Sequence, residues 1–172
     1  SSVKFIATAT IGTDHIDLEY CAKAGICVRN AAGCNAGGVM QYVYTALYAL
    51  ACRKGLQIGE GSRYGTIGVI GVGNVGSKVA ALGEYLGFEV LRCDPAKERE
   101  QTLAFNNGYL QLKDFKDFYS LDYVLENSDI VTLHTDLNPT SRGLAEEEFF
   151  SKMKEGAIFI NSSRGEVVQD EA

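Results

Sequence analysis

Three glycines and one aspartate stand at spacings that suit the binding of phosphate and ribose. The glycines are the first, third and sixth residues of the stretch 71–76, and Asp94 follows Gly76 by 18 residues. Glycine-rich backbone at the start of a helix binds anions, because its N–H groups are unpaired and no side chain blocks the approach. A carboxylate at this distance accepts hydrogen bonds from ribose hydroxyls. The pattern therefore indicates a dinucleotide site, and the charge of Asp94 favours NAD over NADP.

The residues around the glycines predict the elements that this site needs. Residues 66–70 are an apolar run, residues 77–86 carry apolar side chains at helical spacing, and residues 88–93 suggest a second strand. A strand, a glycine turn, a helix and a second strand follow in order. Glycine-rich turns also occur for purely structural reasons, so this context is what favours dinucleotide binding.

Each residue of the turn has an expected part in that site. Gly71 permits the tight turn, Gly73 leaves room for the pyrophosphate, and Gly76 lets the helix pack against its strand. Asn74 and Val75 complete the turn, with Val75 where a methyltransferase would have a further glycine.

Other polar residues follow two later predicted strands. His134 comes directly after the apolar run 129–133, and residues 162–164, Ser-Ser-Arg, come shortly after the run 157–160. Four predicted strands alternate with helices and no hairpin turn separates them, which predicts an α/β fold with a doubly wound parallel sheet and helices on both faces. Since ligands of such sheets bind at the carboxyl ends of the strands, we expect all these residues on one rim.

Charge and cysteine content exclude several classes of partner. A formal net charge of −6 argues against nucleic acid or an anionic membrane surface. The number of cysteines, five, is odd, and no two of them stand at CxxC spacing, so we expect neither a metal site nor a disulfide framework. With no signal peptide and no bilayer-spanning apolar run, the sequence predicts a cytoplasmic protein.

The first third of the chain predicts a second unit and a connector. Residues 1–9, 16–23 and 26–28 suggest a strand, a helix and a strand, as at the end of an α/β domain whose earlier part is absent. A helix is expected over 36–53, with Asn35 able to cap it. The aromatic pair Tyr44 and Tyr48 on this helix suits either packing against the chain's own sheet or a subunit interface.

One region gives no clear periodicity. The charged run 97–100 is most simply a solvated face, and the aromatic residues between 102 and 119 fit neither the helical nor the strand period. We therefore expect irregular or short structure over 102–119.

The ordered motifs resemble the D-isomer-specific 2-hydroxyacid dehydrogenases. The matching segments are Gly12-Thr13-Asp14, Gly33-Cys34-Asn35, Gly71 to Gly76, Ser128 to Val131, His134 to Leu144 and Asn161 to Val168. The resemblance implies two α/β domains, with residues 1–32 belonging to the substrate domain, 33–63 forming a crossover helix and linker, and 64–172 forming an NAD-binding Rossmann domain truncated at its C-terminus. It also implies a homodimer formed through the 36–53 region.

The same resemblance assigns residues to roles. It implies an enzyme that moves a hydride between the nicotinamide and C2 of a D-2-hydroxy acid, using an arginine, a glutamate and a histidine. The implied substrate contacts are Gly12 and Asn35, and the implied cofactor contacts, besides the glycine turn and Asp94, are Pro95, His134, Thr135, Ser141, Ser162 and Ser163.

Only the catalytic arginine has a matching position, Arg164. A guanidinium can grip the carboxylate and carbonyl oxygens of a 2-oxo acid together and stabilise charge that develops on the carbonyl. The glutamate and histidine are expected beyond Ala172. His134 and His15 fit the acid–base role poorly, so we expect these 172 residues to bind NAD without turning substrate over.

Within the family, the motifs are most similar to the erythronate-4-phosphate dehydrogenases, with phosphoglycerate dehydrogenases as the alternative. Both act on phosphorylated 2-hydroxy acids. A non-catalytic dinucleotide-binding module, such as a redox sensor or corepressor-like protein, is the alternative outside enzymes. Asp136 departs from the family pattern, which commonly has proline there, and adds charge near the cofactor's phosphates.

Overall fold

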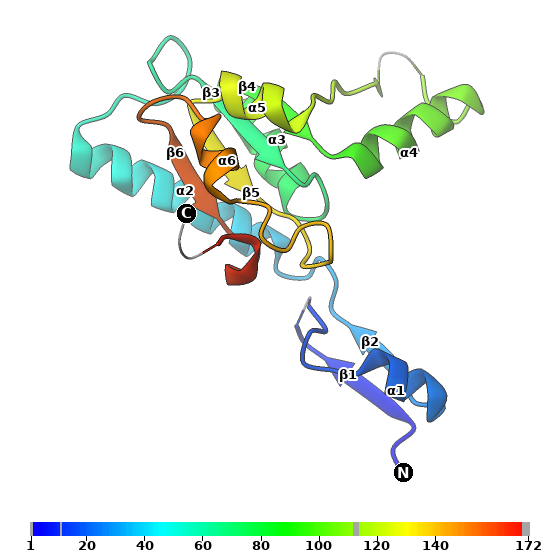
Figure 1. Ribbon diagram of the computed structural model, residues 1–172. Coiled ribbons are helices and arrows are strands. Elements are labelled where there is room, and N and C mark those ends of the chain that lie inside the picture. The colour runs from blue at the N-terminus through cyan, green and yellow to red at the C-terminus, as the bar shows by residue number, and fades with distance from the viewer. Residues whose placement is uncertain (1, 11, 112–113, 170–172) are drawn as a thin grey trace.

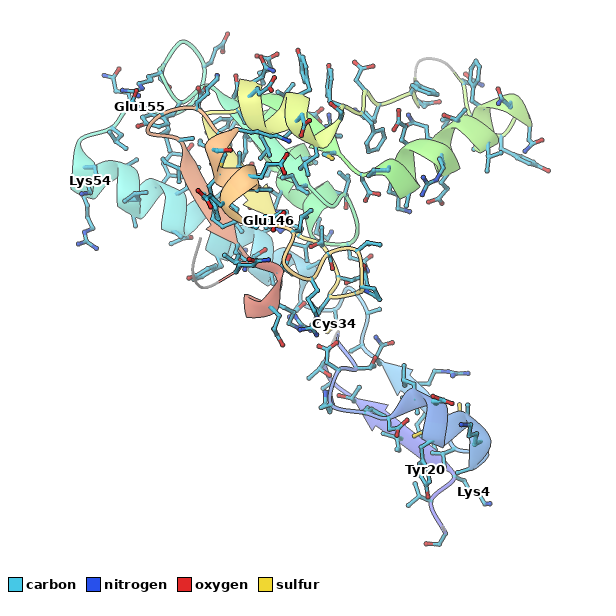
Figure 2. The ribbon with its side chains drawn as sticks, in the orientation of Figure 1. Lys4, Tyr20, Cys34, Lys54, Glu146 and Glu155 are labelled. Carbon is cyan, nitrogen blue, oxygen red and sulfur yellow. The ribbon has the colours of Figure 1, made fainter. Side chains whose placement is uncertain are left out.

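Two parallel sheets organise the chain in the computed structural model, which describes residues 2–10, 12–111 and 114–169. Figure 1 shows the smaller sheet as a lobe that projects from the rest of the molecule. In this lobe β1 (Phe5–Thr8) pairs with β2 (Cys27–Asn30), and α1 (Leu18–Lys23) connects them. The predicted strand, helix and strand are therefore confirmed. Figure 2 places Cys34 where the chain leaves this lobe.

A long helix, α2 (Ala36–Lys54), leads from the small lobe to the large one and ends at Gly55 in the left-handed conformation. Its apolar side packs into the core of the large lobe, where Val43 and Leu47 are buried. The buried hydroxyl of Tyr44 donates to the carbonyl oxygen of Val79, in the helix that follows the first strand of the larger sheet, at 2.8 Å. The expected cap was wrong, since the side chain of Asn35 makes no hydrogen bond to the helix N-terminus.

The larger sheet has the strand order β4-β3-β5-β6, and every neighbouring pair is parallel. These strands are β3 (Thr66–Ile70), β4 (Glu89–Cys93), β5 (Ile130–Leu133) and β6 (Ile158–Asn161). The helices between them are α3 (Gly76–Tyr85), α4 (Pro95–Asn106), α5 (Leu121–Asn127) and α6 (Glu147–Ser151), and a short 3-10 helix, η2, spans Gly165–Val167. The predicted doubly wound parallel sheet is confirmed.

The core divides into two clusters, one on each face of this sheet. Ile67 and Val69 of β3 pack with Val79 of α3 and with the buried residues of α2. Ile70, which points to the opposite face, packs with residues of α5 and α6. Because helices cover both faces, the central strands β3 and β5 consist mainly of apolar residues, as parallel strands commonly do.

Helix α4 is the largest departure from the sequence prediction. The expected irregular or short structure over 102–119 was wrong for 102–106, which is helical. Asp94 accepts hydrogen bonds from the backbone N–H groups of Ala96 and Lys97, at 3.1 and 3.0 Å, and Pro95 occupies the first turn. The helix buries no residue, so it has no apolar periodicity that sequence reasoning could detect.

No helix within the described part of the chain is long and apolar enough to cross a membrane. All five cysteines are free thiols.

Candidate functional site

Two adjoining cavities lie along the carboxyl ends of the strands. The larger, of about 710 Å³, lies between the small lobe and the large one, and the smaller, of about 510 Å³, lies between α4 and the loop after β5. Both are bordered by His134, Thr135 and Asp136, so the two cavities adjoin along this segment.

The glycine turn stands at the junction of the two cavities. Gly71 and Gly73 line the smaller one, whereas Asn74 and Val75 line the larger one. Helix α3 begins here without a side-chain cap, and its N-terminal N–H groups favour an anion. A molecule with a central diphosphate and two bulky ends therefore fits this arrangement, with one end in each cavity.

The glycines of the turn serve different purposes. A Cβ atom on Gly71, whose φ is +84°, would lie 2.8 Å from the carbonyl carbon of His134, and one on Gly76 would overlap the carbonyl oxygen of Gly71. A Cβ on Gly73, by contrast, would meet no protein atom within 4 Å. Packing thus requires glycine at 71 and 76, while at 73 the space left open faces the cavity.

Asp94 lies at the end of β4 and lines the smaller cavity. Its Oδ2 accepts from the N–H of Val72 at 2.8 Å, and its Oδ1 caps α4. Each carboxylate oxygen can accept a further hydrogen bond, so the group remains available to a ribose while its position is fixed by the backbone. The capping role was not predicted, although Asp followed by Pro is a signal for a helix start.

His134 is held between two hydroxyl groups. Its Nδ1 lies 2.6 Å from Ser162 Oγ and its Nε2 lies 3.0 Å from Thr132 Oγ1. Burial lowers the pKa of His134 to about 4, so the ring is neutral at physiological pH. A neutral ring with both nitrogens engaged is poorly suited to general acid–base chemistry, and it fixes the loop to β6 instead.

Two hydroxyl oxygens in the wall of the larger cavity have no protein partner within the described residues. These are Thr135 Oγ1 and Ser163 Oγ, both buried from solvent. A buried hydroxyl without a partner costs free energy, and a polar ligand would supply the missing hydrogen bonds. Together with the open space at Gly73, these orphaned groups show that the site fits a polar dinucleotide.

Ser141 lies in the loop after β5 and makes its hydrogen bonds within that loop. It lines the smaller cavity, but its hydroxyl donates to the carbonyl oxygen of Asp136 and accepts from the N–H of Asn138, at 2.9 Å. Ser141 therefore shapes the loop after β5. Pro95 also lines this cavity, from the first turn of α4.

Arg164 faces the small lobe across the larger cavity. Its Nε donates to Asp14 Oδ2 at 3.0 Å, and its guanidinium lies in the space that a side chain on Gly12 would fill. Gly12 and Asn35 both line this cavity with Arg164. Sequence reasoning did not single out Asp14, although it lies in the same short motif as Gly12.

The comparison with a family profile is specific. The profile described as "D-isomer specific 2-hydroxyacid dehydrogenase, NAD binding domain" matches residues 51–172. Among curated relatives, the erythronate-4-phosphate dehydrogenase of Bacteroides fragilis is 44% identical over all of this chain and 46% of its own length. The enzyme of the same name from Ectopseudomonas mendocina is 40% identical and is covered over 41% of its length. The chain thus spans about half the length of the relatives it matches.

Solved structures that resemble this chain include NAD-bound dehydrogenases of 2-hydroxy acids. The D-lactate dehydrogenase of Aquifex aeolicus, complexed with NAD and lactic acid, has a TM-score of 0.77 and 31% identity, over 98% of this chain and 52% of that one. The NAD⁺-bound 3-phosphoglycerate dehydrogenase of Entamoeba histolytica has a TM-score of 0.76 and 26% identity. The match covers 98% of this chain and 51% of that one. The predicted cofactor, NAD, is confirmed at the level of the family.

Proposed function

The chain belongs to the D-isomer-specific 2-hydroxyacid dehydrogenases, and we propose that it serves as the NAD-binding part of an oxidoreductase acting on a phosphorylated D-2-hydroxy acid such as 4-phosphoerythronate. The single observation that most supports this proposal is the position of the glycine turn between two adjoining cavities, opposite Arg164. The relatives that match over the whole chain, at 44% and 40% identity, bear the name erythronate-4-phosphate dehydrogenase.

The turn and its neighbours would hold the cofactor. We propose the pyrophosphate at the N-terminus of α3, beside Gly73, and the adenosine ribose on Asp94 in the smaller cavity. Thr135 and Ser163 would bind polar groups of the nicotinamide half, because their hydroxyls are buried without partners in the wall of the larger cavity. His134 and Ser162 would keep this wall in place through their hydrogen bond.

Arg164 would act on the substrate. NAD, when bound, would supply or accept through its nicotinamide the hydride at C2 of the substrate. The guanidinium of Arg164 can donate to the substrate's carboxylate and to the oxygen on C2 at once, which orients the acid and stabilises negative charge on that oxygen. Gly12 and Asn35 border the same cavity and would complete the substrate contacts.

The acid–base step would need a group other than His134, since that ring is neutral and hydrogen-bonded on both sides. We propose that the family's glutamate and histidine come from outside these 172 residues.

We also propose residues 1–32 as part of the substrate domain, 33–63 as the connector and 64–172 as the NAD domain. A homodimer through α2 is supported by its exposed Tyr42 and Tyr48, and a cytoplasmic location by the free cysteines.

The test is an activity assay on a chain extended to the length of the curated relatives. NADH formation from NAD would be followed with 4-phosphoerythronate, 3-phosphoglycerate and unphosphorylated D-2-hydroxy acids. We expect turnover with a phosphorylated acid and a loss of at least about a hundredfold in kcat/KM for Arg164→Ala. Saturable NADH binding with no turnover of any acid would instead identify a non-catalytic dinucleotide-binding module.

A further inference from the structure

Helix α4 presents an arginine to the smaller cavity. Arg99 lies four residues after Pro95 and three after Ala96, and all three line the cavity. Residues at these spacings share one face of a helix, so this face of α4 is turned toward the cavity. Since α4 buries no residue, the packing of the protein does not explain an arginine at this position.

The guanidinium of Arg99 has no hydrogen-bond or ion-pair partner within the described residues. Its neighbour Lys97 differs in this respect, because the ammonium of Lys97 pairs with Glu100 at 2.6 Å. The remaining ion pairs of α3, α4 and their surroundings involve Arg92, Glu84 and Lys116. Within the described residues, Arg99 is thus an unpaired cation beside the cavity, whereas Lys97 on the same helix is paired.

The cavity wall that faces Arg99 suits a flat, weakly polar ring. Leu121 and Leu144 contribute apolar side chains, and Ile70 and the buried Cys93 form its inner end. Burial, together with the nearby charges of Asp94 and Glu98, raises the pKa of the Cys93 thiol to about 11, so this thiol is uncharged at physiological pH. Asp94 supplies the carboxylate at the inner edge.

We propose that Arg99 is a cofactor-binding residue whose planar guanidinium covers the face of the adenine ring and closes the solvent side of this cavity. A guanidinium stacks on aromatic faces and is more weakly hydrated than an ammonium, so it loses little solvation on covering the ring. Its positive charge also offsets that of Asp94 across the cavity. The inference rests on the proposed function, because it places the adenosine half of NAD in the smaller cavity.

Three ligands can distinguish a contact of Arg99 with adenine from an effect of the substitution on the whole cofactor site. NADH and AMP both contain adenine, whereas reduced nicotinamide mononucleotide does not. We would measure the Kd of each, and of NADPH as a probe for a 2′-phosphate contact, by fluorescence or calorimetry on the wild-type chain, Arg99→Ala and Arg99→Lys. The matched control is Lys97→Ala, which removes the same charge from the same helix at a residue that does not line the cavity.

For Arg99→Ala we expect the Kd of NADH and of AMP to rise about 3- to 30-fold, with the Kd of the mononucleotide unchanged. Arg99→Lys should weaken binding by an intermediate factor, because lysine keeps the charge but lacks the planar guanidinium. Lys97→Ala should leave all three Kd values unchanged.

The assignment would be overturned by a Kd for NADH within twofold of wild type in Arg99→Ala. It would also be overturned if Lys97→Ala weakened binding equally, or if Arg99→Ala weakened binding of the mononucleotide. A larger loss for NADPH than for NADH would also overturn it, since that result identifies a 2′-phosphate contact. If the wild-type chain bound neither NADH nor AMP, the proposed function itself would fail.

Discussion

Arg164 and Asp14 join the two lobes through a hydrogen bond of 3.0 Å from Nε to Oδ2. Arg164 follows β6 of the large sheet, and Asp14 lies in the loop after β1 of the small one, 150 residues earlier. Because the guanidinium also rests against Gly12, its orientation depends on the small lobe. The lobe that is proposed to belong to the substrate domain therefore positions the proposed catalytic group of the other.

Asp14→Ala should impair the reaction through Arg164 while leaving the cofactor site intact. Both side chains are about half exposed, so the pair contributes modestly, and we expect kcat/KM to fall roughly 3- to 10-fold. Asp14→Asn keeps an acceptor oxygen and should lose less. The measurement is steady-state kinetics on the extended chain, alongside the Kd of NADH. Equal weakening of NADH binding would show that Asp14 supports the fold rather than the orientation of Arg164.

Gly73→Ala and Gly76→Ala should have opposite consequences. An added methyl at 73 meets open space in the protein, so the melting temperature should hold while NADH binding weakens roughly tenfold or more. At 76 the methyl overlaps the carbonyl oxygen of Gly71, and we expect a loss of about 1–3 kcal/mol in the free energy of unfolding. Thermal unfolding and NADH titration of both variants would decide this. An unchanged NADH affinity in Gly73→Ala would remove the turn from the cofactor site.

Two substitutions at Asp94 can separate its roles. Serine caps helices almost as well as aspartate, so Asp94→Ser should retain most of the stability that Asp94→Ala loses, about 1 kcal/mol. Both variants lack the carboxylate and should weaken NADH binding by an amount on the order of 1–3 kcal/mol. Chemical denaturation and calorimetry give the two quantities. Wild-type affinity in the serine variant would mean that Asp94 acts only as a cap.

His134 predicts a particular dependence of stability on pH. Its pKa of about 4 in the folded chain lies below the ordinary value of 6.5, so the unfolded chain binds the proton first as pH falls. The free energy of unfolding should therefore decline between about pH 6.5 and pH 4, by an amount on the order of 3 kcal/mol, and His134→Asn should lack this component. Urea denaturation at several pH values would test it. If the difference in the free energy of unfolding between the two proteins did not change with pH, the lowered pKa of His134 would be contradicted.

Local patterns predicted the frame of the site because each element depends mainly on nearby residues. The run 66–70, the glycine turn and the apolar spacing of 77–86 predicted β3, the turn and α3 to within one residue. Helix α4 was missed because its stability comes from the Asp94 cap and ordinary helix propensity, with no buried face to produce a pattern.

Contacts between distant parts of the chain could not be predicted in the same way. The pairing of Asp14 with Arg164 depends on how the two lobes meet. The position of Arg99 at the smaller cavity depends on where α4 lies beside the loop after β5. Likewise, the sequence placed His134 on the rim, but its neutral state follows only from burial between Ser162 and Thr132.

NAD binding at the glycine turn is tested most directly by titrating the wild-type chain with NADH, monitored by the fluorescence of the reduced nicotinamide, and by repeating the titration with Gly73→Ala. We expect saturable binding to one site per chain, weakened at least about tenfold by the added methyl while the circular dichroism spectrum stays the same. Absence of saturable binding to a folded wild-type chain at millimolar NADH would contradict NAD binding at the turn.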